Sequence, residues 1–232
     1  MASERAGRSV SPKGVGPSQA EVVSEPERVQ LALATATKLL GREVTAVDLA
    51  SLAGAPDWAR VEVQAGLKSV GIMVEHEELA MSLSLEQEGQ DAILWLLDVL
   101  VTRGDRGLGA AIHARQLEAA RRLGVKRLKL NAVRDPDSNP PKVGYSVWPI
   151  FGYEADLPAQ ITEILPDSLK EARTIQDLLA RDGRDWWHTH GVTLRDAVFR
   201  TGNRSRSSQA WKVYASRKDL GLWQRLLRGI SQ

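Results

Sequence analysis

The sequence lacks cysteine, lacks a long apolar run and carries little net charge. Without cysteine there is no disulfide framework, no thiolate metal site and no cysteine nucleophile. No stretch approaches the roughly 18 consecutive apolar residues of a membrane-spanning helix, so we expect no membrane span. The formal net charge at pH 7 is only +2, so the chain as a whole is not expected to bind polyanions.

The N-terminus lacks the apolar core of a secretory signal. Residues 1–23 are instead rich in Ser, Gly, Pro and basic residues, a composition that predicts a disordered tail. We therefore expect a soluble, cytoplasmic protein. The rest of the chain is long and apolar enough to bury a core, since 43% of all residues are hydrophobic.

After a helical pattern over residues 24–40 and a short one over 46–52, the apolar period changes to two. Alternation around residues 61–63, 71–76 and 79–85 predicts antiparallel strands with one solvated face. Residues 92–101 are apolar except for Asp98. This run predicts a central strand buried on both faces, although a buried helix fits it too.

A glycine-rich turn follows that run directly. Gly104, Gly107 and Gly109 lie beside Arg103 and Arg106, ahead of a helix expected over residues 107–123 and a strand over 126–133. The first N–H groups of a helix are unpaired and attract phosphate, and glycines let a ligand approach the backbone closely. The alternative is that the glycines only turn a strand into a helix. The turn matches neither G-x-G-x-x-G nor a Walker A sequence.

The last part of the chain, residues 159–232, predicts short helices rich in Trp and Arg. From Arg195 onwards it contains nine Lys or Arg and two Asp, a net charge of +7. Trp211 and Tyr214 are interleaved with these cations, an arrangement that suits binding to nucleic acid. The alternative is that the two rings turn inward and leave a solvated basic helix face. His188 and His190 have no carboxylate at matching spacing and predict no metal site, and His113 is expected on a helix surface.

The order of these features resembles the GNAT-type N-acetyltransferase superfamily. Residues 104–109, Gly-Asp-Arg-Gly-Leu-Gly, carry the glycines of its Gln/Arg-x-x-Gly-x-Gly/Ala turn, with Arg103 displaced by one position. Later, Gly152-Tyr153 takes the place of the family's Gly-Phe, and Trp148 takes the place of its tyrosine. The resemblance covers about residues 60–158.

This resemblance implies an α/β (α+β) fold in which a mixed, mostly antiparallel sheet is flanked by helices. We expect residues 24–158 to form the acyltransferase domain. Residues 159–232, which lie outside the resemblance, are expected to form a helical C-terminal extension rich in Trp and Arg. The resemblance also implies that acetyl-CoA is the co-substrate and that the acceptor is an amine on a small molecule or a protein.

The resemblance further implies where acetyl-CoA lies. The pyrophosphate would rest on the turn and the start of the helix, at Arg103, Gly104, Arg106, Gly107, Leu108, Gly109 and Ala110. The pantetheine arm would pair with the strand before the turn, at Val99, Leu100 and Val101, as an added strand.

For catalysis we expect Asp98 as the base and Tyr145 as the acid that protonates the leaving thiolate. Burial of Asp98 in its apolar run would raise its pKa, unless it faces an edge or pairs with an arginine. Tyr145 is chosen because it precedes Trp148 by one helical turn. The alternative function is a GNAT-like binding module without catalysis that contacts nucleic acid through its basic C-terminus.

Overall fold

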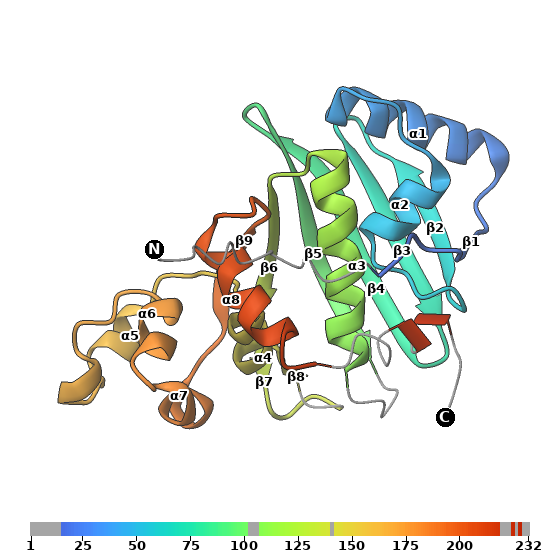
Figure 1. Cartoon of the computed structure of the whole chain (residues 1–232). Helices are drawn as coiled ribbons and strands as arrows, with labels where there is room; N and C mark the ends of the chain where they lie inside the picture. Colours follow the sequence, from blue (N-terminus) through green and yellow to red (C-terminus); the bar gives the residue numbers. More distant parts are fainter. Residues whose placement is uncertain (1–14, 102–106, 140–141, 219–223, 226, 229–232) are drawn as a thin grey trace, which may run out of the picture.

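The structure is a computed structural model that describes residues 15–101, 107–139, 142–218, 224–225 and 227–228 (Figure 1). The chain folds around a seven-stranded sheet in the order β1-β2-β3-β4-β5-β6-β9. Of the strand pairs of this sheet in the described residues, only β1–β2 and β5–β6 are parallel. The expected mixed α/β fold with a mostly antiparallel sheet is therefore confirmed. The strands are β1 (Glu21–Val22), β2 (Arg60–Ala65), β3 (Ser69–His76), β4 (Leu79–Glu88), β5 (Asp91–Val101), β6 (Arg127–Ala132) and β9 (Leu194–Arg200).

The two faces of this sheet differ in chemistry because side chains alternate along each strand. One row of paired positions consists of Val63, Ile72, Leu83, Leu96 and Leu130, all of which are buried. The neighbouring row on the other face consists of Gln64, Gly71, Ser84, Trp95 and Lys129. The first face carries the hydrophobic core, as the period-two pattern predicted.

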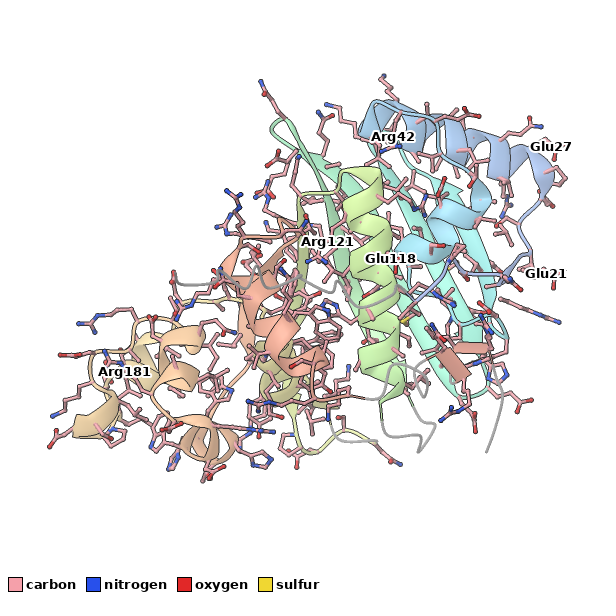
Figure 2. The ribbon with its side chains drawn as sticks, in the orientation of Figure 1. Glu21, Glu27, Arg42, Glu118, Arg121 and Arg181 are labelled. Carbon is pink, nitrogen blue, oxygen red and sulfur yellow. The ribbon has the colours of Figure 1, made fainter. Side chains whose placement is uncertain are left out.

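Helices cover the apolar face. Figure 1 shows α3 running along this face, with α1 and α2 on one side of it and α8 on the other. The helices α5, α6 and α7 gather beyond the β9 edge, with Arg181 among them in Figure 2. The helices are α1 (Pro26–Leu40), α2 (Ala46–Leu52), α3 (Leu108–Leu123), α4 (Gly144–Phe151), α5 (Ala159–Thr162), α6 (Ile175–Ala180), α7 (Arg184–His190) and α8 (Arg206–Ala215), with a 3₁₀ turn at Asp167–Leu169. None of the helices in the described residues is long and apolar enough to cross a bilayer.

The prediction of a disordered tail over residues 1–23 is wrong for residues 15–23, while residues 1–14 lie outside the described part. Val15 and Ser18 are buried. The Ser18 hydroxyl donates to the Ala55 carbonyl at 2.7 Å, and β1 pairs with β2. A Ser- and Pro-rich composition does not reveal such pairing, because a segment pairs with the free backbone N–H and C=O groups of a sheet edge through its own backbone and not through its side chains.

The prediction of an all-helical C-terminal extension is wrong at β9. This strand pairs antiparallel with β6 and buries Leu194, Ala197 and Phe199. Part of residues 159–232 therefore belongs to the main sheet. Two tryptophans of this segment, Trp187 and Trp211, pack inward and are 2% and 6% exposed.

Candidate functional site

The strands β5 and β6 separate part-way along their length. They pair in parallel from Ile93–Arg127 to Leu96–Leu130. Beyond that point β5 continues to Val101 and β6 to Ala132 with no further pairing between them. Together the two strands form a splay that opens toward their carboxyl ends.

A bulge accompanies this separation. On β4, Leu83 pairs with Leu96 and Ser82 with Asp98, so Leu97 is an extra residue in β5. A bulge bends its strand and leaves the extra residue unpaired. Leu97 is 61% exposed. The bulge is thus located where β5 leaves β6.

The predicted pantetheine-binding residues lie on the free stretch of β5. Val99, Leu100 and Val101 pair with β4 on one side and have no paired strand on the β6 side within the described residues. Backbone amides of such a stretch are available to an extended ligand that carries amide groups.

The first N–H donors of the helix α3 have no hydrogen-bond partner among the described residues. Its first residue follows Gly107, which has φ 107°, and neither a side-chain cap nor an acidic residue in the first turn is present. The Ala111 N–H donates to the Gly107 carbonyl at 2.9 Å. The N–H groups of Leu108, Gly109 and Ala110 precede that first helical bond and are left for an outside acceptor.

The space beside this helix start is open. A Cβ added to Gly109 would meet no atom of the described residues within 4 Å. The helix is 16 residues long and so carries a substantial dipole, with its positive end at this turn. Three of the predicted pyrophosphate-binding residues, Arg103, Gly104 and Arg106, lie outside the described residues.

The expected burial of Asp98 is wrong. Its side chain is 66% exposed, and Oδ1 lies 3.9 Å from Nζ of Lys142. The bulge at Leu97 explains this, because it shifts the alternation of β5 and turns Asp98 to the polar face beside Ser82. Asp98 is therefore a solvated carboxylate at the splay rather than a buried one.

Tyr145 lies on α4, as expected, but its hydroxyl is engaged. It donates to the His188 carbonyl at 2.8 Å, and the Tyr145 carbonyl accepts from Nε1 of Trp187 at 2.9 Å. The side chain is 7% exposed, and the Arg134 guanidinium lies 5.1 Å from the ring centre. These contacts hold α4 against α7, so the structure gives Tyr145 a packing role.

His113 is not on a surface, contrary to expectation. It is fully buried on α3 and lies within 6.3 Å, between ring centres, of five aromatic rings. Neither ring nitrogen has a hydrogen-bond partner in the described residues. Burial lowers the pKa of His113 to about 3. The positive charge of Arg121 also lowers this pKa, whereas the Gln116 side chain raises it. The rings around it are Trp148, Phe151, Tyr153, Phe199 and Trp211.

Sequence reasoning missed two cations near the splay. Lys142 reaches Asp98 from β8 (Lys142–Val143), which pairs with β7 (Arg134–Asp135). Arg134 covers the Tyr145 ring and donates from Nη1 to the Gly191 carbonyl. Both cations belong to a Pro- and Asp-rich segment. Its composition predicts a loop but does not predict which part of the sheet the loop contacts.

Of the two aromatic residues predicted to be interleaved with the basic residues, Trp211 turns inward and Tyr214 is half-buried. Trp211 is buried and stacks on Tyr214 at 5.5 Å between ring centres. The basic face is therefore not interleaved with an exposed tryptophan at this position. Among the described residues, no group of three or more His, Asp or Glu is arranged to hold a metal ion.

Comparison of the chain with protein-family models and with curated protein sequences found no match.

Proposed function

We propose that the protein is an acetyl-CoA-dependent N-acetyltransferase with the GNAT arrangement. One observation carries the proposal: two parallel strands splay apart, and the first of them leads, through a glycine-rich turn, into an uncapped helix. Within the described residues, the end of the strand offers free backbone amides and the start of the helix offers unpaired N–H donors. A ligand with an amide-bearing arm and a pyrophosphate fits this order of groups.

In this proposal the pyrophosphate accepts hydrogen bonds from the first N–H groups of α3. The open space at Gly109 allows phosphate oxygens to approach the backbone. Arg103 and Arg106, which precede the helix in the sequence, supply charge-assisted bonds. The arm lies along Val99–Val101, which brings the thioester to the bulge in β5.

The reaction is attack of a neutral amine on the thioester carbonyl. The carbon–nitrogen bond forms, a tetrahedral oxyanion develops, and the carbon–sulfur bond then breaks to release the thiolate. Backbone N–H groups of the splayed part of β5 stabilise the oxyanion. Asp98 accepts the proton that the amine loses, directly or through a water molecule, and the thiolate takes its proton from solvent, since the Tyr145 hydroxyl is bound to His188.

The test is release of free CoA from acetyl-CoA across a panel of amines. We expect turnover with at least one amine, and we expect Asp98→Asn to reduce it about 10²-fold, the lower end for a lost general base. Asp185→Asn, an exposed aspartate on α7, is the matched control and leaves turnover unchanged. Equal turnover in Asp98→Asn and the parent would remove Asp98 from the mechanism.

The second candidate is a binding module that has lost catalysis. It is favoured by Trp148, whose indole cannot act as an acid where the family has a tyrosine, and by the engaged hydroxyl of Tyr145. Measurable acetyl-CoA binding without turnover on any amine would support this candidate.

A further inference from the structure

A second site lies at the carboxyl end of β6. An open cleft of about 670 Å³ is lined by Arg134, which follows β6, by Thr193 and Arg195 at the start of β9, and by Asp156 and Pro158. Its volume falls within the roughly 300–1,000 Å³ of small-molecule sites. The cleft therefore suits a small ligand.

This cleft is structurally joined to the splay. Arg134 lies on β7, which pairs with β8, and Lys142 of β8 lies 3.9 Å from Asp98 of β5. The cleft and the splay thus open at the same end of the sheet.

The charged side chains of the cleft differ in whether they already have partners in the protein. Arg134 is held by the Gly191 carbonyl and by the face of the Tyr145 ring. The side chains of Arg195 and Asp156 are exposed and make no hydrogen bond or ion pair with any other described residue. One free cation and one free anion therefore line the same cleft.

We infer that this cleft binds the head group of an amino acid. The carboxylate pairs with the Arg195 guanidinium, and the α-ammonium pairs with the Asp156 carboxylate. Pro158 and Val192 contribute apolar walls for the carbon chain.

The same arrangement specifies which amine reacts, a step that rests on the proposed function. An amine held on Asp156 stays protonated and is no nucleophile. The reacting amine must therefore be a second one, at the far end of the ligand. The inferred acceptor is a diamino acid of the lysine or ornithine type, acetylated on its side-chain amine.

Calorimetric titration with three probes and inorganic phosphate tests the inference. L-Lysine and L-norleucine both carry the head group and are expected to bind equally. Cadaverine, which lacks the carboxylate, and inorganic phosphate, which lacks the ammonium, are expected to bind at least about 10-fold more weakly. Binding of cadaverine or phosphate as tight as that of lysine would overturn the inference.

Variants locate the site. Arg195→Gln and Asp156→Asn are each expected to weaken lysine binding about 10-fold. Arg204→Gln and Asp185→Asn change exposed charges elsewhere and leave it unchanged. Unaltered binding in both cleft variants would overturn the inference.

A parallel titration with acetyl-CoA separates this inference from the proposed function. Lysine binding without acetyl-CoA binding would support the cleft and contradict the acetyltransferase. Acetyl-CoA binding without lysine binding would contradict the cleft alone.

Discussion

At the scale of single residues, the burial of His113 makes stability depend on pH. It joins α3 to α4, β9 and α8 by ring contacts, and neither of its nitrogens is hydrogen-bonded in the part of the chain that the structure describes. A neutral imidazole is tolerated in such a cluster, whereas an imidazolium would be a buried, unpaired charge. Arg121, which in Figure 2 projects from α3 on the side of β9 and α8, makes that charge still less favourable.

Stability should therefore fall as the pH drops below the ordinary pKa of histidine. The folded-state pKa of about 3 lies below the unfolded value of ~6.5, so the unfolded chain takes up the proton first. The contribution of neutral, buried His113 to the free energy of unfolding is fully present above pH ~6.5 and is lost progressively as the pH falls to ~3. Between pH 7 and pH 5 we expect a loss of about 2 kcal/mol, measured by urea unfolding.

His113→Phe should remove this loss in that window, because phenylalanine has no proton to gain. His188→Gln, a change on the exposed side of α7, should keep it. Equal pH dependence in the parent and in His113→Phe would contradict the account of His113.

Asp57 links three parts of the chain. Its Oδ1 accepts from Nη1 of the buried Arg115 at 2.9 Å and from the Gln19 N–H at 3.0 Å, and its own N–H donates to the Leu227 carbonyl. Among the described residues, Asp57→Ala leaves Nη1 of the buried guanidinium with only the Ala55 carbonyl as a partner. We expect about 3 kcal/mol of destabilisation, read from denaturant unfolding; a loss below ~0.5 kcal/mol would contradict this role.

At the scale of elements, the N-terminal segment is part of the fold. A chain that begins at Ser24 loses the pairing of β1 with β2 and the buried Ser18 contacts with Ser51 and Ala55. We expect its melting temperature to fall by several degrees, since each lost hydrogen bond contributes about 1 kcal/mol. An unchanged melting temperature would show that residues 15–23 contribute nothing.

The sequence predicts elements well where the alternation of side chains is regular. The meander β2–β4 keeps its period of two, and its buried faces match the pattern. The start and end of α3 agree with Gly107 and Gly124. The arginines and glycines ahead of α3 indicated the turn. That the N-terminus of α3 has no side-chain cap could be seen only in the three-dimensional structure.

The misses coincide with irregular pairing. In β9 the spacing of buried residues jumps from Leu194 to Ala197, because Asp196 has φ 51° and the register with β6 shifts nearby. The alternation is thus broken in the sequence, and no strand was expected. The bulge at Leu97 has the same effect on β5, where it exposes Asp98 inside an apolar run.

At the scale of the whole molecule, the core is one layer between a sheet and the helices on its apolar face. Phe199 of β9 and Trp211 of α8 close this layer at one edge. A chain that ends at Pro158 loses both and leaves His113 and β6 uncovered. We expect such a chain to aggregate or to unfold without cooperativity in a thermal melt; a soluble monomer with a sharp transition would contradict a single core.

The central claim is that the start of α3 binds the pyrophosphate of acetyl-CoA. Gly107 is a poor place to test it, because its φ of 107° strains any side chain. At Gly109 a Cβ atom meets no atom of the described residues within 4 Å, but a side chain there would occupy the space that the phosphate needs.

The most direct measurement is calorimetric titration of acetyl-CoA into the parent, into Gly109→Val and into Gly202→Val, a matched change in open space elsewhere. The account predicts that the parent and Gly202→Val bind alike, and that Gly109→Val melts within a few degrees of the parent yet binds at least about 100-fold more weakly. Equal affinity in Gly109→Val, or no acetyl-CoA binding by the parent, would contradict the claim.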